Sequence, residues 1–376
     1  MSWVWLRDGD RVPPRICAED FGNEEPITIA DDLAKDLRPY HMPEDSTLLR
    51  LLSTYFADAK NIAYISHTII LEFSEMSAEK WIELLERSPS SILNASVGLS
   101  HSNGPILKTE LKRQKIPVAT SLANAQEDDT NYVTSIGCFH PGAMLHAPSG
   151  DETSAGIAIQ KGNQRRLTVP IHAWYNNEST MDFSETAEFK VSQASTAVGN
   201  IVAQIGKTDV GLMEFAGGIK FDNTFLDIPS SANTLVPFTE IRVMDNCLIN
   251  NFLTGRQKVK SLGKRMVTEE NVEKNLKRKK QNLPSPGKYI ALRQEIYATN
   301  SAVINGDPKN VCGSAVIRVK KAILLGDRLG VGSICRFMHW SDLQLKYDEI
   351  GNLLCFADSV DPLIDDSWRV CQDPSI

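Results

Sequence analysis

The sequence of this 376-residue chain predicts a mainly β protein with an α/β region at the N-terminus. From about residue 154 onward, short apolar runs alternate with turns rich in Gly, Asn and Asp, and little helix separates them. Between residues 40 and 125, amphipathic runs at helical spacing alternate with apolar runs, as in a small α/β domain. The polar stretch 121–135 indicates a linker. We therefore expect an N-terminal α/β domain of unknown role over residues 1–130 and a β region after it.

The N-terminal elements follow from their periodicity. Residues 46–56, STLLRLLSTYF, have the spacing of an amphipathic helix, with Ser46 as the expected N-cap. Residues 62–73 are rich in Ile, Tyr and Phe and predict a buried strand. A second helix is expected over residues 77–88, SAEKWIELLERS.

The β region begins with a hairpin signal. Two apolar runs, residues 154–160 and 166–174, flank the turn KGNQ at 161–164. Further strands are expected over residues 187–195, 199–206, 210–215, 238–243, 288–298 and 314–319. The basic polar segment 264–282 is expected to interrupt these strands, and residues 366–374 are expected to form a short terminal helix.

Composition and charge exclude several classes of function. The net charge of −7 argues against electrostatic capture of nucleic acid by the whole protein. No run of about 18 apolar residues occurs, so we expect no membrane partner. The basic run LKRKK (276–280) is either a polyanion contact or nuclear signal, or a solvated face, and the wider basic stretch 264–280 is the candidate for any nucleic-acid association.

The cysteines indicate where the protein works. Seven cysteines without regular spacing, and no secretory signal, predict reduced thiols in a cytoplasmic or nuclear protein. The spacings typical of zinc sites are missing, and we expect neither a metal nor a cofactor. The sequence leaves the oligomeric state open.

One cysteine has neighbours suited to chemistry. Cys312 lies in GDPKNVCGSAVIRV (306–319), a glycine-flanked turn directly before an apolar strand. A thiol that cleaves an amide needs a base to take its proton and a group that orients the base. His172 ends an apolar strand, and Asp209 begins another after a Gly-Lys-Thr turn. Each also has a simpler interpretation: a core thiol, a strand-end histidine and a turn residue that caps its own backbone.

These three segments together resemble the cysteine-nucleophile type of chymotrypsin-like protease, best known in viruses, and uncharacterised fungal trypsin-like proteins. The motifs are RLTVPIHAW (166–174), TDVGLMEF (208–215) and NVCGSAVIR (310–318), in the order His, Asp, nucleophile. The resemblance implies a double six-stranded β-barrel over 150–345, with barrels at about 150–235 and 236–345, and a C-terminal extension at 346–376.

The resemblance also implies roles for single residues. Cys312 is the expected nucleophile of a cysteine endopeptidase acting on a protein or peptide, His172 its general base and Asp209 the orienting acid. The N–H groups of Cys312 and Asn310 are the expected oxyanion hole, although the family usually has Gly where this chain has Asn310. His339 is the expected substrate-binding residue, or else packs beside Trp340. The rival hypothesis is a protease-like fold without turnover that serves as a binding or scaffold protein.

Overall fold

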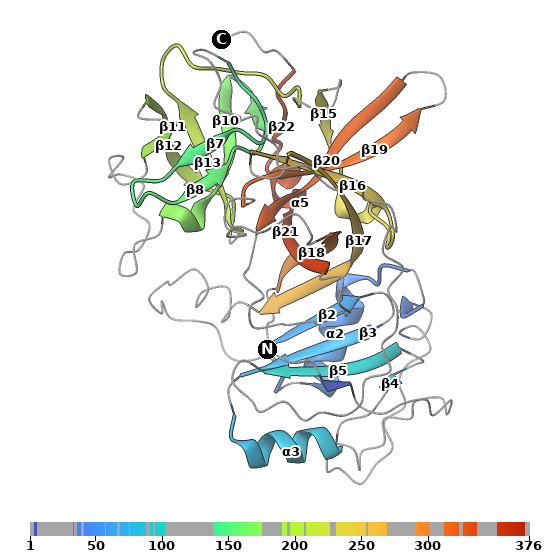
Figure 1. Cartoon of the computed structure of the whole chain (residues 1–376). Coiled ribbons are helices and arrows are strands. Elements are labelled where there is room, and N and C mark those ends of the chain that lie inside the picture. Colours follow the sequence, from blue (N-terminus) through green and yellow to red (C-terminus); the bar gives the residue numbers. More distant parts are fainter. Residues whose placement is uncertain are drawn as a thin grey trace.

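The computed structural model shows a mainly β protein (Figure 1). It describes the following residues: 4–5, 33, 36–38, 41–56, 58–65, 68–74, 76–87, 91–92, 95–101, 138–174, 190–193, 196–206, 208–225, 231–252, 255–268, 291–300, 312–322, 326–336 and 352–372. Most of the described residues belong to two large sheets, and a pair of two-residue strands, β6 (Cys138–Phe139) and β14 (Lys220–Phe221), pairs separately.

The first sheet contains eight strands in the order β22-β9-β10-β13-β12-β11-β7-β8 and lies at the upper left of Figure 1. Its strands are β7 (Met144–His146), β8 (Glu152–Ser154), β9 (Ala158–Lys161), β10 (Gln164–Pro170), β11 (Lys190–Gln193), β12 (Thr196–Gln204), β13 (Val210–Phe215) and β22 (Arg369–Val370). The predicted hairpin is confirmed as β9 and β10, and β13 has the predicted bounds.

The segment between β8 and β9 makes backbone hydrogen bonds to two other parts of the first sheet, in addition to the strand pairs given above. The N–H of Gly156 donates to the carbonyl of Thr168 in β10 at 2.9 Å, and the N–H of Thr168 donates to Ile157 at 3.0 Å. On the other side of the same segment, Ala155 exchanges two bonds of 2.8 Å with residues 142 and 143, just before β7. The sheet therefore curls so that the segment after β8 lies between β7 and β10.

The second sheet contains a closed ring of six antiparallel strands, β16-β17-β18-β21-β20-β19, in which β19 returns to β16. The strands are β16 (Asn246–Asn251), β17 (Gly255–Thr268), β18 (Ala291–Asn300), β19 (Ala315–Ala322), β20 (Gly326–Arg336) and β21 (Asn352–Ser359). Because the fourth strand along the chain lies beside the first, the connection is a Greek key.

The N-terminal strands continue this second sheet, because the 14-residue β17 extends past β16 and pairs there with β2. The order is β1-β5-β3-β2-β17, with β4 on β5. The bounds are β1 (Val4–Trp5), β2 (Asn61–Ile65), β3 (Thr68–Phe73), β4 (Ser91–Ile92), β5 (Ala95–His101), α2 (Asp45–Tyr55) and α3 (Ala78–Arg87). The predicted second helix is confirmed, whereas the single strand expected over 62–73 is a pair of antiparallel strands. The first helix begins one residue before Ser46, with Glu44 as its N-cap.

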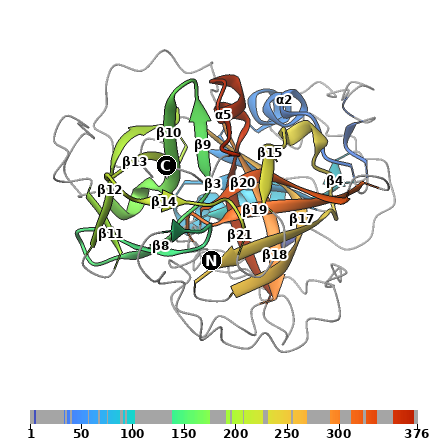
Figure 2. The same ribbon diagram turned by 90° about the horizontal axis from the view of Figure 1, so that it is seen from above.

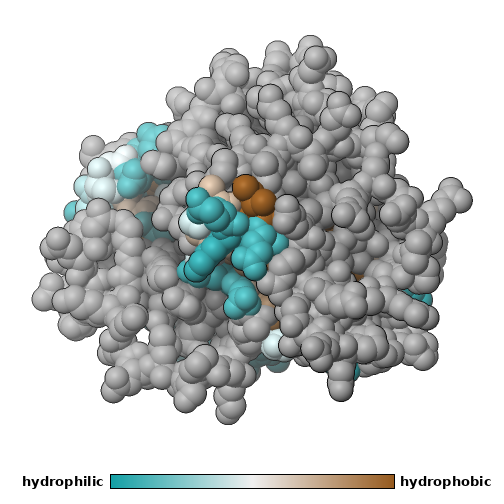
Figure 3. All heavy atoms as spheres, turned by 90° about the horizontal axis from the view of Figure 1, so that it is seen from below, coloured by the Kyte–Doolittle hydropathy of each residue, from teal (hydrophilic) through white to brown (hydrophobic). Residues whose placement is uncertain are grey.

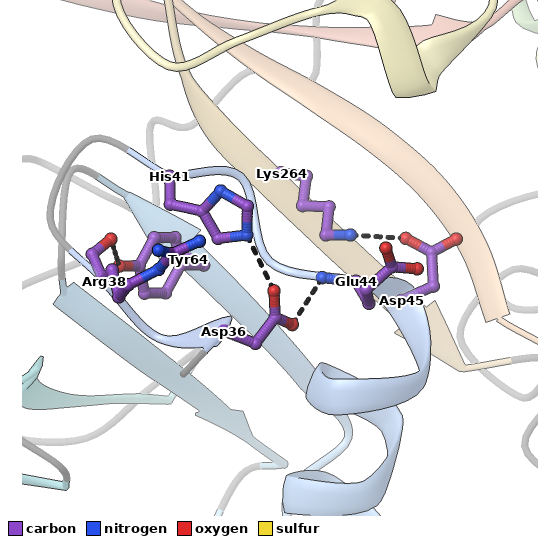
Figure 4. Close-up of polar contacts among 7 residues, drawn as sticks. All are labelled: Asp36, Arg38, His41, Glu44, Asp45, Tyr64 and Lys264. Atoms are coloured by element: carbon purple, nitrogen blue, oxygen red, sulfur yellow. Dashed lines mark hydrogen bonds and ion pairs between the residues drawn. The ribbon is translucent and has the colours of Figure 1, made fainter. Parts of the chain in front are cut away.

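The expectation that a polar segment interrupts the strands from residue 264 is wrong for residues 264–268, which end β17. The Lys264 side chain is only 1% exposed, and its ammonium group lies 2.5 Å from Asp45 Oδ1 at the start of α2 (Figure 4). Arg265 donates to Glu72 of β3 at 2.8 Å. Both basic side chains thus form ion pairs with acidic residues of the N-terminal region. The remainder of the basic stretch 264–280 lies outside the described residues.

Two further expectations about secondary structure are wrong. Residues 238–240 form a 3-10 helix where a strand was expected, because Pro237 precedes them and the N–H of Phe238 donates to Asp361. The expected terminal helix lies earlier, as α5 (Asp361–Asp365), and β22 follows it within the predicted helical range. Residues 352–372, predicted as part of an extension, thus supply one strand to each sheet.

The two sheets pack through a shared apolar core. Alternate residues of β13 face opposite sides: Met213 belongs to the core of the first sheet, whereas Val210 and Leu212 pack against Ile317 of β19 and Val331 of β20. The chain also passes from one sheet to the other at two short strands, because β22 follows β21 of the second sheet and β15 comes after β13 of the first. β22 pairs with β9, and β15 (Ala232–Leu235) pairs in parallel with β20 (Figure 2).

The far end of the molecule is formed by the N-terminal elements, with α3 lowest in Figure 1. The view from below shows a mostly hydrophilic described surface with a small hydrophobic area (Figure 3). Ile82 of α3 is an exposed large hydrophobic side chain, at 43%. Among the described residues, no helix is long and apolar enough to cross a membrane.

Candidate functional site

His172 follows β10 directly. The strand ends at Pro170, which has no N–H to continue a ladder, and residues 171–174 turn into the 3-10 helix η2 (Ile171–Trp174). Ile171, Ala173 and Trp174 are buried, so the turn is fixed on both sides of the histidine. The His172 side chain remains 32% exposed. The imidazole is therefore held by its neighbours and only partly exposed.

Asp209 lies opposite this turn because β10 and β13 pair in register. Pro170 is paired with Val210, so the residue after β10 faces the residue before β13, and Ile171 donates its N–H to the Asp209 carbonyl at 2.8 Å. The tight turn before Asp209 is closed by Thr208, whose hydroxyl donates to Ile205 and accepts the N–H of Val210. Thr208 thus performs the capping role that the simpler interpretation gave to Asp209.

The Asp209 carboxylate holds His172 at two points. Its Oδ2 lies 2.5 Å from His172 Nδ1, and its Oδ1 accepts the His172 backbone N–H at 2.9 Å. The Asp209 side chain is only 2% exposed, so water competes little for these bonds. A buried carboxylate that bonds both the ring and the backbone fixes the direction of the ring and places a proton on Nδ1.

Cys312 comes from the other sheet, three residues before β19. Its carbonyl accepts the N–H of Ser154 at 2.8 Å, which attaches the turn to the end of β8. Gly313 has φ +91°, a left-handed conformation that side-chained residues rarely adopt. A Cβ at Gly313 would lie 2.2 Å from the Ser154 carbonyl oxygen and 2.5 Å from Pro170 Cδ. Only glycine after Cys312 lets this turn pack against the strands that carry His172.

The Cys312 side chain is hydrogen-bonded to the His172 ring, which brings the three predicted residues together. Burial disfavours the imidazolium, but attraction to Asp209 and Cys312 and hydrogen bonds to both outweigh it and raise the pKa of His172 well above its ordinary value. Because Asp209 occupies Nδ1, Nε2 is the nitrogen left for the thiol. The arrangement can move a proton between sulfur and imidazole.

Sequence reasoning missed a fourth residue, Asp358 of β21. Its Oδ2 accepts the Asp209 backbone N–H at 2.6 Å, and the residue is fully buried. The signal was present in the sequence: an aspartate in the apolar run LLCFADSV (353–360). Charged residues are rarely buried without a partner, so such an aspartate indicates a specific contact.

The other two predicted site residues are not placed. Asn310 and His339 lie outside the described residues. Their roles in the oxyanion hole and in substrate binding stay predictions.

No protein-family model matches the chain, and no curated protein matches it. Among solved structures, it is similar to a Nocardiopsis protease at 11% identity and TM-score 0.36, covering 62% of this chain and 98% of that one. Protease A of Thermobifida fusca matches at 10% identity and TM-score 0.34, covering 63% and 100%. A glutamic acid-specific serine protease matches at 13% identity and TM-score 0.37, covering 62% and 100%.

Proposed function

We propose that this chain is a cysteine endopeptidase that acts on a protein or peptide inside the cell. The observation that carries the proposal is one imidazole bonded to both an acid and a thiol. His172 lies 2.5 Å from Asp209 through Nδ1 and hydrogen-bonds Cys312, which comes from a different sheet. A nucleophile, a base and an orienting group in contact are the arrangement that activates a thiol.

The strand order supports a chymotrypsin-like architecture with two barrels. The closed Greek-key ring β16–β21 corresponds to the second barrel, and the curled first sheet corresponds to the first. His172 and Asp209 lie on the first unit and Cys312 at the edge of the second, in the chain order His, Asp, nucleophile. A substrate bound at this junction would meet all three groups.

The proposed reaction is acyl transfer through a thioester. Proton transfer from the Cys312 thiol to His172 Nε2 gives a thiolate–imidazolium pair, which the raised pKa of His172 favours, and the sulfur then attacks the carbonyl carbon of the scissile peptide bond. The C–N bond then breaks, and the imidazolium gives its proton to the leaving amine. Water next attacks the thioester, His172 takes a proton from it, and the acid product leaves as the thiol regains its proton.

The remaining roles are part of the same proposal. The N–H groups of Cys312 and Asn310 would stabilise the oxyanion that forms in each half of the reaction. His339 would contact the side chain of the substrate. The reaction needs no metal or other cofactor.

A second candidate function rests on the burial of the thiol. Cys312 is 0% exposed, so a substrate carbonyl reaches the sulfur only after neighbouring groups move. A protein with this fold and a permanently covered thiol would serve as a binding or scaffold protein. The two functions differ in whether Cys312 reacts with an acylating electrophile.

The test is covalent labelling of the full-length chain with a peptide acyl trap directed at thiols, with the modified residue located by mass spectrometry. We expect the label on Cys312 in the wild type, none in Cys312→Ala, and a labelling rate lower by about 10²–10⁴ in His172→Ala. Cys247→Ala is the matched control, because Cys247 is also a buried thiol of the ring, at 2% exposed.

The control should label like the wild type. If Cys312→Ala and the wild type label equally, the endopeptidase proposal fails. If a folded wild type takes no label at Cys312 while smaller thiol reagents modify it only after unfolding, the scaffold function holds instead.

A further inference from the structure

We infer that Asp358 is a positioning residue that holds the acid of the proposed triad from the opposite sheet. Its carboxylate accepts the Asp209 backbone N–H, with Oδ2 and N 2.6 Å apart. The inference deepens the proposed function and rests on it, since the triad is what Asp358 positions.

The backbone of Asp209 is held on both sides. On one side its carbonyl accepts the N–H of Ile171, next to His172 in the same unit. On the other side its N–H donates to Asp358, which belongs to the ring. The carboxylate of Asp209 is therefore fixed relative to both units at once.

Strand register places Asp358 and the nucleophile at the same end of the ring. Ala315 of β19 is paired with Ile334 of β20, and Ile334 is paired with Asp358 of β21. These three residues form one row across neighbouring strands, and Cys312 comes three residues before the row begins. A displacement of β21 would thus change the position of the acid relative to the thiol.

Because Asp358 is buried, a role in packing alone would cost the free energy of removing its carboxylate from water. Asp358 is 0% exposed, and a buried carboxylate is expensive unless hydrogen bonds compensate it. An apolar side chain of similar size would fill the same space in β21 without this cost. The retained carboxylate gives the Asp209 N–H a strong, charge-assisted acceptor.

The experiment measures the pKa of His172 by NMR titration of the full-length protein with labelled histidine. The signal is assigned with His172→Gln. The variants are Asp358→Asn, which keeps an oxygen acceptor without the charge, and Asp358→Leu, which removes the acceptor. Asp361→Leu is the matched control. Asp361 lies in the segment that follows β21, and its carboxylate also accepts a backbone N–H, that of Phe238, at 2.8 Å.

If Asp358 positions Asp209, the pKa of His172 stays near the wild-type value in Asp358→Asn and in Asp361→Leu. In Asp358→Leu the Asp209–His172 bonds loosen, and the pKa falls by about one pH unit or more toward 6.5. An unchanged pKa in a folded Asp358→Leu protein overturns the inference. An equal fall in Asp358→Asn and Asp358→Leu also overturns it, because the charge and not the position would then be responsible.

A second measurement covers the case in which Asp358→Leu does not fold. The Asp209 amide proton should resonate far downfield in the wild type and move upfield in Asp358→Asn, where the acceptor is neutral. A wild-type amide at an ordinary position contradicts the inference. Neither readout uses labelling of Cys312, so a failure of the endopeptidase proposal would be recognised separately.

Discussion

The first sheet and the six-stranded ring contribute to the candidate site in different ways. In the first sheet, the register of β10 with β13 alone sets His172 opposite Asp209, and two bonds of 2.5 and 2.9 Å join them. The ring supplies Cys312 and Asp358, whose positions depend on how the ring packs on the first sheet. The His–Asp pair is thus a local product of strand pairing, whereas the thiol is brought to it by tertiary packing.

The largest effect should come from disrupting the local pair. Asp209→Asn keeps the size of the side chain but removes the charge that stabilises the imidazolium, so the pKa of His172 should fall. The amide also favours the wrong ring tautomer, and the rate of Cys312 acylation should drop by about 10³–10⁴. Labelling kinetics and NMR titration of His172 measure the two effects.

Glu214→Gln is the control for this change, because Glu214 lies at the end of β13 and pairs with Arg166 away from His172. It should leave the His172 titration unchanged. A wild-type titration curve in Asp209→Asn would refute the assignment of the acid.

The next effect concerns the contact between the two units. Gly313→Ala puts a Cβ 2.2 Å from the Ser154 carbonyl oxygen and forces an L residue to φ +91°. We expect a loss of about 2–4 kcal/mol in the free energy of unfolding, measured by urea denaturation.

Gly162→Ala separates backbone strain from the clash. Gly162 also has a positive φ, +57°, in the β9–β10 turn, but nothing lies within 4 Å of its would-be Cβ. Its cost should be about 1–2 kcal/mol. Equal losses at the two glycines would show that the contact with Ser154 and Pro170 contributes nothing.

The same contrast explains how much the sequence could predict. In the first sheet, β9 ends just before Gly162, β10 ends at Pro170, and β13 was predicted to the residue. His172 and Asp209 were found because each lies at the end of such a strand. Their contact then follows from antiparallel pairing.

The ring was harder because its signals are not local. β17 carries Lys264 and Arg265, whose charges made the segment look like a solvated interruption until their partners in the N-terminal region were known. Asp358 was missed because its partner is a backbone N–H 149 residues away. A single sequence shows that a residue is charged, but it does not show the distant partner whose hydrogen bonds compensate for burying that charge.

A smaller effect should come from the contact of the N-terminal region with β17. Asp45→Asn removes the carboxylate that lies 2.5 Å from the ammonium group of the buried Lys264, while the ring of Phe238 remains 5.0 Å away. Removing one partner of a buried pair is destabilising, and we expect about 2 kcal/mol here because Asp45 is 26% exposed.

Labelling at Cys312 measures whether this contact matters for the site. The rate should remain that of the wild type in Asp45→Asn, since the partner of Asp45 is Lys264, in the part of β17 that pairs with β2. A loss of labelling as large as that in Asp209→Asn would show that the N-terminal strands and the site are coupled. The exposed pair Lys161–Asp366 gives the comparison, and Lys161→Ala should change neither quantity measurably.

The smallest effect is a pH dependence of stability that belongs to the local pair. In the folded protein the pKa of His172 lies above its unfolded value of about 6.5, so folding takes up a proton between the two values. The stabilisation is fully present below about pH 6.5 and is lost as the pH rises through the folded pKa. Each unit of difference in the pKa contributes about 1.4 kcal/mol.

Urea unfolding of Cys312→Ala with and without His172→Gln, from pH 6 to 9, isolates the contribution of Asp209, because the thiol is absent from both proteins. A difference between these two proteins that does not shrink with rising pH would mean that Asp209 does not hold the imidazolium, and that the thiol alone raises the pKa of His172.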